Sequence, residues 1–369
     1  MKILIAPDKF KSSLSAHQIS EVISKNLSVR GYRPTACPLA DGGEGTASIL
    51  TELAGGRLIL VPVHDPLMRI VTAAYGLSPD GSTAFIEMAQ ASGLWRLKKN
   101  ESDPRVTTTA GTGELIIHAL DSGVKKIILG CGGSATNDGG VGMAAALGWK
   151  FFDFADQEFI PTGGTLVNLQ RIEDNLVHPR IRQVSFTVIS DVTNPLTGSN
   201  GAAYTFGPQK GADVNSVKRL DEGLIHLDRI FSKYSGRSFD SLPGSGAGGG
   251  MGAGEGFFLN AEWVQGIHYV IQASGLEEKI KESDLVITGE GKLDHQSLQG
   301  KVVSGVSMLC KKHQRPLWVI CGINELDGEE IRLLGAERII SIGNLAGKME
   351  ESMGRPAYWI DQAISQAFQ

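Results

Sequence analysis

The spacing of apolar and polar residues at the start of the chain predicts a strand followed by a helix. Residues 2–7, KILIAP, form a short apolar run that is typical of a buried strand. In residues 15–31 the apolar side chains recur at helical spacing, which predicts one apolar face on a helix. Ser15 and Gln18 have the spacing of a capping box, and Gly31 marks the end of this helix.

The strand-then-helix order returns at both ends of the chain. It repeats at residues 35–40 and 46–56, and from Asp284 onward apolar strands again alternate with helices up to a last helix near Phe368. Near-continuous apolar strands that alternate with helices are typical of a parallel sheet covered on both faces. Both ends of the chain are therefore expected to build one such sheet.

The middle of the chain has a different pattern. Apolar and polar residues alternate on both sides of the Pro79-Asp80-Gly81 turn, which predicts a β-hairpin and hence antiparallel pairing. A strand at 184–191 and a long helix at 214–236 follow. This region is therefore expected to form a mixed α/β domain.

The chain is long enough for two domains. Its 369 residues exceed what one hydrophobic core usually supports. We expect an α/β fold whose first domain is discontinuous and Rossmann-like, with a parallel sheet, and is formed by residues 1–62 and 283–369 together with part of 107–148. A mixed α/β domain is expected to be inserted at about residues 63–282.

Composition and charge exclude several classes of function. Hydrophobic residues make up 41% of the chain and charged residues 20%, and no apolar run approaches the roughly 20 residues that span a bilayer. The net charge is −5 with no run of five like charges, so nucleic acid is not an expected partner. The N-terminus is typical of a strand rather than a signal peptide, and the four cysteines have no C-x-x-C spacing. We therefore expect a cytoplasmic protein with no membrane partner, whose sequence leaves its oligomeric state open.

Small, acidic and glycine-rich loops follow five of the predicted strands. They are PDKFK (7–11), ADGGEG (40–45), GCGGSATNDGG (130–140), SDVTNP (190–195) and GEGKLD (289–294). In open parallel sheets, ligands bind beyond the carboxyl ends of the strands. These loops are therefore the predicted binding site.

The loop at 130–140 has the features of a phosphate cradle. Glycines let backbone N–H groups approach a ligand, and a helix that begins directly afterwards adds its positive dipole end. Ser134, Thr136 and Asn137 add hydrogen-bond donors, whereas Asp138 would repel a bare phosphate and indicates either a nearby Mg²⁺ or a helix cap. The alternative is a turn whose glycines serve only packing. The candidate nucleotide-binding residues are Gly132, Gly133, Ser134, Thr136, Asn137, Asp138 and Glu290.

Two known nucleotide-binding motifs can be compared with this loop. The P-loop pattern G-x-x-x-x-G-K-[ST] is absent from the chain, whereas GCGGSA matches G-x-G-x-x-A after a strand. The second match is weak, because the stretch NDGG intervenes before the helix and a dehydrogenase leaves the other loops unexplained. An NAD-dependent 2-hydroxy-acid dehydrogenase and a non-catalytic small-anion binding protein remain the alternatives.

A second glycine-rich segment occupies residues 244–256. Its composition suits either another loop of backbone donors or a hinge between the domains. Both alternatives stay open at this point.

Carboxylates and lysines near the strand ends supply what phosphoryl transfer needs. That reaction uses cations on the phosphates, Mg²⁺ held by one or two carboxylates, and a carboxylate that takes the acceptor's proton. The candidates are Asp8, Asp41, Glu44, Asp191, Glu290 and Asp294 among the acids and Lys9, Lys11, Lys210, Lys292 and Lys301 among the cations. Taken singly, such a residue is more often a helix cap or a solvated lysine. No histidines have zinc-ligand spacing, so zinc is not expected.

Eight motifs spread over nearly the whole chain resemble the bacterial type-1 glycerate kinase family. They are PDKFKSSLSA, PLADGGEGT, GTGEL, ILGCGGSATNDGG, SDVTNPLTG, FGPQKGA, GSGAGGGMGAG and LVITGEGKLDHQSLQGK. The resemblance implies ATP-dependent phosphorylation of D-glycerate, usually described at the 2-hydroxyl, by a two-domain α/β protein. The chain departs from the family pattern at Ala110, Cys131 and Lys292, of which Ala110 and Lys292 could alter side-chain contacts with a ligand.

The resemblance and the loop chemistry together give candidate roles. Lys11, with Lys9 as the second choice, is expected to pair with the glycerate carboxylate. Asp191 is the expected general base because it ends a strand and precedes a rigid V-T-N-P turn, and Asp41 or Asp8 is expected to hold Mg²⁺. The candidate catalytic residues are Asp191, Lys11 and Asp41, the candidate substrate-binding residues are Asp8, Lys9, Ser12, Asn194 and Lys292, and the candidate metal ligands are Asp41 and Asp8.

Overall fold

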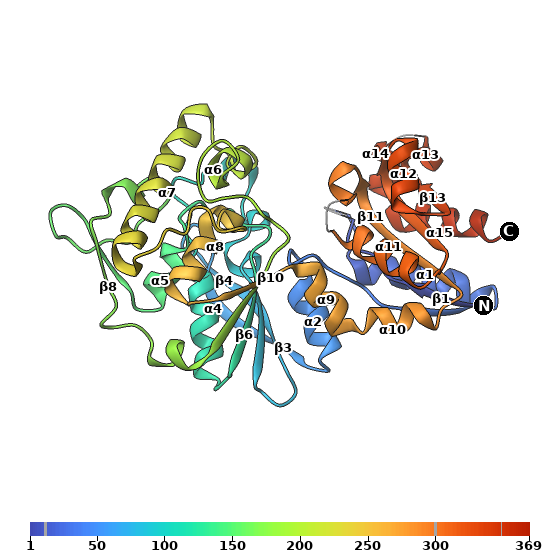
Figure 1. The fold of residues 1–369 in the computed structure, drawn as a ribbon, viewed down its shortest axis with the longest axis horizontal. Helices are drawn as coiled ribbons and strands as arrows, with labels where there is room; N and C mark the ends of the chain where they lie inside the picture. Colours follow the sequence, from blue (N-terminus) through green and yellow to red (C-terminus); the bar gives the residue numbers. More distant parts are fainter. Residues whose placement is uncertain (11–12, 299–300, 348) are drawn as a thin grey trace. The chain divides into compact units, whose positions relative to one another are not determined.

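The structure of the chain is a computed structural model, which describes residues 1–10, 13–298, 301–347 and 349–369. The described chain divides into two compact units (Figure 1). The first contains Met1–Asp41 and Gln265–Gln369, and the second contains Gly42–Val264. Each unit has its own sheet and its own apolar core.

The first unit is built on a five-stranded parallel sheet. Its strand order is β13-β12-β11-β1-β2. These strands are β1 Lys2–Ile5, β2 Arg33–Ala36, β11 Leu285–Leu293, β12 Leu317–Asn324 and β13 Arg338–Ser341. Because both ends of the chain contribute strands, the predicted α/β fold with a discontinuous parallel-sheet domain is confirmed.

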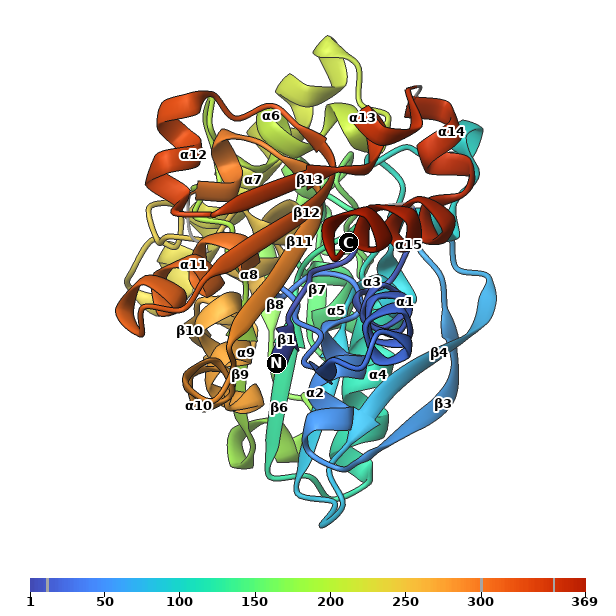
Figure 2. The same ribbon diagram turned by 90° about the vertical axis from the view of Figure 1, so that its right-hand side faces the viewer.

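Helices cover both faces of this sheet (Figure 2). On one face, α1 (Ala16–Val29) and α15 (Pro356–Ala367) pack side by side. There, Ile3 and Ile5 of β1 join apolar side chains of both helices in a buried cluster. On the other face lies α11 (Val302–Lys312). The central strands β1, β11 and β12 are therefore largely buried, which is why they are mostly apolar, whereas the edge strand β2 is mostly exposed.

The start of α1 has the predicted capping box. The backbone N–H of Gln18 donates to Ser15 Oγ (3.2 Å), and the backbone N–H of Ser15 donates to Gln18 Oε1 (2.9 Å). The two reciprocal bonds satisfy backbone donors that the helix leaves unpaired. The other helices of this unit are α9 Gly266–Ser274, α10 Leu276–Lys281, α12 Gly328–Leu334, α13 Ile342–Ala346 and α14 Met349–Gly354.

The second unit is built on a six-stranded mixed sheet. Its order is β10-β9-β6-β5-β4-β3, with antiparallel pairing among β3, β4 and β5 and parallel pairing from β5 to β10. The strands are β3 Arg57–His64, β4 Ile70–Leu77, β5 Thr83–Glu87, β6 Lys126–Gly130, β9 Ser185–Ile189 and β10 Glu262–Val264, with β7 Lys150–Phe152 and β8 Arg171–Glu173 forming a separate pair. The predicted hairpin around the Pro79-Asp80-Gly81 turn is confirmed as β4 and β5.

Helices pack around this second sheet and share its core. They are α2 Thr46–Leu53, α3 Ala89–Ser92, α4 Ala110–Asp121, α5 Val141–Ala146, α6 Ala202–Phe206, α7 Val214–Ser235 and α8 Ala247–Phe258. Apolar side chains of β6, β9, α4, α7 and α8 belong to one buried cluster. This cluster holds the loops beyond β6 and β9 on a rigid base.

The boundaries of the two units differ from the predicted ones. Residues 42–62 belong to the second unit rather than the first, because β3 pairs with β4 along its whole length. Residues 107–148 also lie in the second unit, because β6 pairs with β5 and β9 there. Residues 265–282 belong to the first unit as α9 and α10. Apolar periodicity identifies strands but does not say which sheet they join.

Two further features concern the cysteines and the lengths of the helices. All four cysteines are buried free thiols. Within the described residues, every helix is too short or too polar to cross a bilayer.

Candidate functional site

The predicted site residues fall into two groups, one in each unit. The first unit contains Asp8, Lys9, Asp41, Glu290 and Lys292, and the second contains Gly132, Gly133, Ser134, Thr136, Asn137, Asp138, Asp191 and Asn194. Lys11 and Ser12 lie outside the described residues. The first five therefore belong to one unit and the other eight to the second.

In the first unit, three acidic side chains act on one another near the carboxyl end of β1: Asp8, Asp41 and Glu290. Glu290 lies within β11, which extends to Leu293, so most of the segment predicted as a loop at 289–294 is strand. The backbone N–H of Asp8 donates to Gly289 O (2.8 Å), which fixes Asp8 beside the middle of β11. The pKa of Asp8 is raised to about 7, mainly by burial and also by the charges of Asp41 and Glu290, while Lys9 acts in the opposite direction. The Asp41 carboxylate lies 3.8 Å from Lys9 Nζ. Ionising all three carboxyl groups together is therefore unfavourable despite the nearby Lys9.

The pKa of Glu290 is raised for the same reasons as that of Asp8. Burial raises its pKa to about 7, and the charges of Asp294 and Asp41 act in the same direction, whereas a hydrogen bond from Ser297 and the charge of Lys301 act against them. A bound cation would relieve this repulsion by displacing the protons.

The described residues of the first unit do not form a complete protein cage for a metal. Among the described residues, no three or more His, Cys, Asp or Glu side chains are arranged to hold an ion. Mg²⁺ often keeps several waters and uses only one or two carboxylates together with substrate phosphates. The pair Asp8 and Asp41 fits that kind of site. Lys292, which was predicted to contact the substrate, forms ion pairs with Glu325 (2.9 Å) and Asp294 (3.7 Å).

In the second unit, two loops leave the neighbouring strands β6 and β9 at the same edge of the sheet, and the segment at Gly42 packs against them. Gly130 of β6 is paired with Ile189 of β9 in parallel register, so Gly132 and Asp191 each lie two residues beyond a matched pair. The loop that contains Gly42 joins them, since a Cβ on Gly42 would lie 2.6 Å from Ile189 O. The predicted convergence of loops at strand ends is therefore present within this unit.

The loop at 130–140 is exposed at only one place. Gly133 is exposed and has a φ of +76°, whereas Thr136, Asn137 and Asp138 are fully buried. Close packing requires Gly132, where a Cβ would lie 2.6 Å from Gly43 Cα, but near Gly133 the closest atom is the Ala89 Cβ at 3.2 Å. The backbone at Gly133 is therefore the part of this loop that a ligand can approach.

Asp138 has the geometry of a helix cap. Its carboxylate accepts hydrogen bonds from the backbone N–H groups of Thr109 (2.8 Å), Gly140 (3.2 Å) and Gly142 (3.3 Å) and from the Thr109 hydroxyl (2.8 Å). Burial raises its pKa and outweighs these hydrogen bonds, which lower it. Of the two explanations left open for Asp138, these contacts favour the cap, because they join the starts of α4 and α5.

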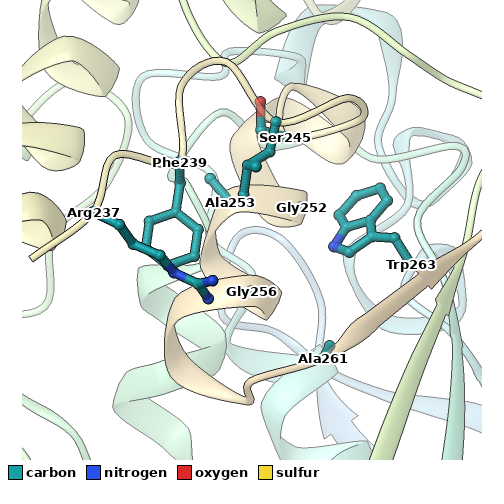
Figure 3. A pocket seen from close by; sticks show the side chains of 9 residues that line it. Arg237, Phe239, Ser245, Gly252, Ala253, Gly256, Ala261 and Trp263 are labelled. Carbon is teal, nitrogen blue, oxygen red and sulfur yellow. The ribbon is translucent and has the colours of Figure 1, made fainter. Parts of the chain in front are cut away.

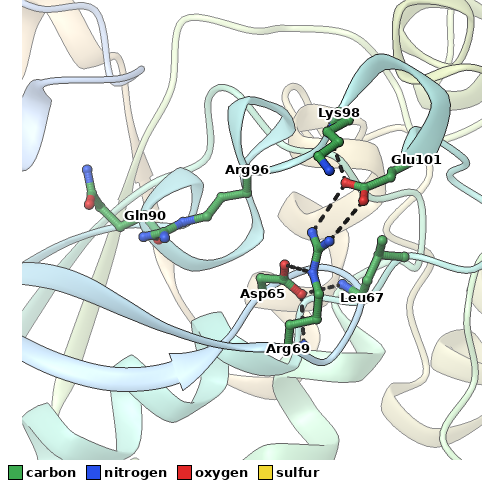
Figure 4. A network of polar contacts seen from close by, with 7 residues as sticks. All are labelled: Asp65, Leu67, Arg69, Gln90, Arg96, Lys98 and Glu101. Carbon is green, nitrogen blue, oxygen red and sulfur yellow. Dashed lines mark hydrogen bonds and ion pairs between the residues drawn. The ribbon is translucent and has the colours of Figure 1, made fainter.

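A polar network lies next to the segment that precedes α4, whose residue Thr109 binds Asp138 (Figure 4). Arg69 Nε donates to Asp65 Oδ2 (2.6 Å), and Arg69 Nη1 donates to Glu101 Oε1 (3.0 Å). The turn that Asp65 and Arg69 enclose offers Pro66 O to the backbone N–H of Thr108 (3.0 Å). The network therefore fixes the segment that leads into α4.

Asp191 and Asn194 lie in the loop that follows β9. Asp191 is partly buried and lies two residues beyond the end of β9. Asn194 Nδ2 donates to Asn200 O (2.8 Å), and the backbone N–H of Gly246 donates to Asn194 O (3.1 Å). Asn194 therefore ties this loop to the glycine-rich segment at 244–256.

That glycine-rich segment packs against the loop at 130–140. A Cβ on Gly249 would lie 1.9 Å from Thr136 O, and the backbone N–H of Gly139 donates to Gly249 O (3.1 Å). The segment lies inside the second unit, whereas the chain passes between the units at 41/42 and 264/265. Its position therefore does not match that of an inter-domain hinge, and its glycines allow close backbone contact.

The opposite face of α8 lines a small cavity of about 120 Å³ (Figure 3). Phe239 and Trp263 stand on either side of it, with Arg237 next to Phe239. A Cβ on Gly252 would lie 2.3 Å from the Trp263 ring, and one on Gly256 would lie 3.1 Å from Phe239. The glycines of α8 thus make room for aromatic rings on one face and for backbone on the other.

Comparison with known proteins decides the family. The model of the Glycerate kinase family matches residues 3–369. The chain belongs to the glycerate kinase family. The resemblance predicted from the motifs is therefore confirmed, and the protein is a kinase.

Relatives of known name support this family over nearly the full chain. The chain is 44% identical to a glycerate 2-kinase of Escherichia coli K12, over 97% of this chain and 94% of that protein. It is 42% identical to a glycerate kinase of Halalkalibacterium halodurans, over 98% and 96%. A crystal structure from Salmonella typhimurium LT2, assigned provisionally as glycerate kinase 2, is 39% identical, superposes with a TM-score of 0.80 and covers 100% of this chain and 98% of that one.

In this glycerate kinase family member, two buried ionisable residues lie beside the loop at 130–140: Lys210, a candidate cation to which the sequence assigned no specific role, and Glu255, which was not predicted. Lys210 donates from Nζ to Ser134 Oγ (2.7 Å) and Thr136 O (2.6 Å), and Glu255 accepts a hydrogen bond from Cys131 Sγ (2.9 Å). The sequence offered Lys210 only as one of several lysines. A glutamate within an otherwise apolar, glycine-rich run was the available signal for Glu255.

Proposed function

We propose that this kinase transfers the γ-phosphoryl group of ATP to D-glycerate, with the 2-hydroxyl as the favoured acceptor and 2-phosphoglycerate as the product. Family membership supports D-glycerate as the acceptor and ATP as the donor. The observation that carries the mechanism is the matched register of β6 and β9, which sets Asp191 and the exposed Gly133 loop at one edge of one sheet.

Asp191 is the proposed general base. A carboxylate that accepts the proton of the attacking hydroxyl accelerates phosphoryl transfer when its position is fixed. Asp191 lies two residues beyond the end of the buried strand β9, and hydrogen bonds of Asn194 hold the loop that follows it. These contacts support a base that loses little freedom when the substrate binds.

The backbone around Gly133 is the proposed contact for the nucleotide phosphates. Its left-handed conformation and exposure let the peptide groups of this loop approach an anion without a side chain in between. Ser134, Thr136, Asn137 and Asp138 are buried behind it, so their proposed contribution is to fix the loop. Glu290 is also proposed to act toward the nucleotide: its carboxylate would attract a cation, and that cation would interact with the phosphates.

Asp8 and Asp41 are the proposed ligands of Mg²⁺. The ion, when bound, would neutralise charge on the transferred phosphate. The raised pKa of Asp8 supports a cation beside it, because a positive charge would favour the ionised carboxylate. Lys9 and Lys11 are proposed to pair with the glycerate carboxylate, and Ser12, Asn194 and Lys292 are proposed as further substrate contacts.

The proposed place of action is the cytoplasm. An ATP-dependent kinase needs a compartment in which ATP is maintained. Four buried free thiols are compatible with a reducing compartment, where cysteines act as small apolar residues.

A coupled assay tests this proposed function. We expect ADP release when the protein, Mg-ATP and D-glycerate are present together, and no release when glycerate or Mg²⁺ is omitted. Glycerate with NAD⁺ or NADH should give no change in nicotinamide absorbance. Hydride transfer without ATP would favour the dehydrogenase alternative, and ligand binding without turnover would favour the anion-binding alternative.

A further inference from the structure

A lysine is buried beneath the loop that we propose to contact phosphate. Lys210 is only 2% exposed and ends the 3₁₀ turn Pro208–Lys210. Its ammonium group donates to Ser134 Oγ (2.7 Å) and to Thr136 O (2.6 Å). The acceptors belong to the residues one and three positions after the exposed Gly133.

A buried ammonium group needs an explanation beyond packing. Removing a charge from water is costly unless it is paired and fully hydrogen-bonded. Lys210 has two neutral acceptors, and Asp138 is the charged group that acts on it. Burial lowers its pKa to about 7, which records the cost of keeping the ammonium there. An apolar side chain of the same length would fill the space without that cost.

The loop is held on two opposite sides. On one side the backbone N–H of Leu94 donates to Gly133 O (2.9 Å), and that of Ala135 donates to Ser92 O (2.9 Å). On the other side Lys210 holds Ser134 and Thr136 through its ammonium group. Both sets of contacts flank the exposed peptide, so together they determine its conformation.

We propose that Lys210 is a positioning residue for nucleotide binding: its ammonium group holds Ser134 and Thr136 so that the exposed backbone around Gly133 keeps the shape that accepts the donor's phosphates. The inference rests on the proposed role of this loop in binding ATP. It assigns Lys210 no contact with the substrate.

Two variants of Lys210 test the inference. Lys210→Met keeps the length of the side chain and removes the donors, so KM for ATP and Kd for ADP should rise about 10- to 100-fold, while KM for D-glycerate changes less than about 3-fold. In Lys210→Ala, added ethylammonium should restore part of the ADP affinity, and tetramethylammonium, which has no N–H donor, should not. The exposed Lys218→Met on α7 is the matched control.

Ser134→Ala keeps the inference testable if the lysine variants do not fold. It removes one of the two acceptors of Lys210, so KM for ATP should rise about 3- to 10-fold without a matching change for glycerate. Thermal unfolding of each variant identifies the folded ones. Folded variants with an unchanged KM for ATP, or with equal changes in both KM values, would overturn the role of Lys210.

Gly133→Val separates this inference from the proposed function. If wild-type protein uses ATP and Gly133→Val weakens ATP binding while Lys210→Met does not, only the role of Lys210 is wrong. If wild-type protein neither binds ADP nor releases it from ATP, the proposed function and the inference both fail.

Discussion

Replacing Glu255 by glutamine should change how the stability of the protein depends on pH. Glu255 is 1% exposed, and its carboxyl group accepts a hydrogen bond from the Cys131 thiol. Burial raises its pKa from 4.5 to about 8, and the hydrogen bond from Cys131 lowers it only in part. The native protein therefore keeps a proton on Glu255 at pH values where the unfolded chain has lost it.

The sign and size of the effect follow from proton linkage. Between pH 4.5 and about 8 the native state binds one proton more than the unfolded state, so its stability falls as pH rises. The free energy of unfolding changes by about 1.4 kcal/mol per pH unit for one such proton, or about 2 kcal/mol between pH 6 and 8, because the native carboxyl group is already half ionised near pH 8. Above about pH 8 the native carboxyl group ionises too, and the slope ends.

Glu255→Gln removes this proton without removing the hydrogen-bond acceptor. Its amide N–H groups are buried, which lowers stability at every pH by about 1 to 3 kcal/mol. This loss does not depend on pH. As pH rises from 6 to 8, the Tm of the variant should therefore increase relative to that of the wild type by roughly 5 to 10 °C for a unit of this size. Other buried ionisable groups contribute to both proteins and cancel in the difference.

Thermal unfolding followed by circular dichroism at several pH values measures this difference. The matched control is Glu262→Gln, which changes an exposed glutamate of the same unit and should give a curve parallel to that of the wild type. Parallel curves for Glu255→Gln and the wild type would refute the reasoning, because they would mean that Glu255 is already ionised in the native protein at pH 6.

Three further predictions concern the proposed site. Asp191→Asn should lower kcat by about 10² to 10⁴ with little change in substrate binding; a near-normal kcat in folded protein would remove Asp191 as the base, and recovery at high Mg²⁺ would make it a metal ligand. Gly133→Val should raise KM for ATP far more than KM for glycerate in steady-state assays, because a side chain would block backbone approach at a left-handed position; equal effects would favour the packing alternative. Asp41→Asn should raise the Mg²⁺ concentration that gives half-maximal activity about tenfold, and an unchanged Mg²⁺ dependence would exclude Asp41 as a ligand.

Local sequence signals predicted the elements of this fold well. The Ser15 and Gln18 capping box and the hairpin around the Pro79-Asp80-Gly81 turn depend on residues close together in the chain, and both are present. The extent of each unit depends instead on which strands pair. β3 pairs with β4 and β6 with β9, and no local pattern distinguishes these partners from strands of the other sheet.

The sequence predicted where the candidate site lies in the second unit, but not the buried side chains around it. The rule that ligands bind beyond strand ends correctly indicated that the loops after β6 and β9 lie together. It did not indicate that Lys210 and Glu255 are buried beside them. Their partners lie 76 and 124 residues away in the sequence, at Ser134 and Cys131, so only the tertiary fold creates these contacts.

The product of the reaction tests the central claim most directly. Enolase dehydrates 2-phosphoglycerate and does not act on 3-phosphoglycerate, so purified protein is incubated with Mg-ATP, D-glycerate and enolase while ADP and phosphoenolpyruvate are both followed. We expect phosphoenolpyruvate to form in step with ADP, and L-glycerate to give far less of either. ADP without phosphoenolpyruvate would contradict transfer to the 2-hydroxyl, and the absence of both products would contradict the proposed kinase reaction itself.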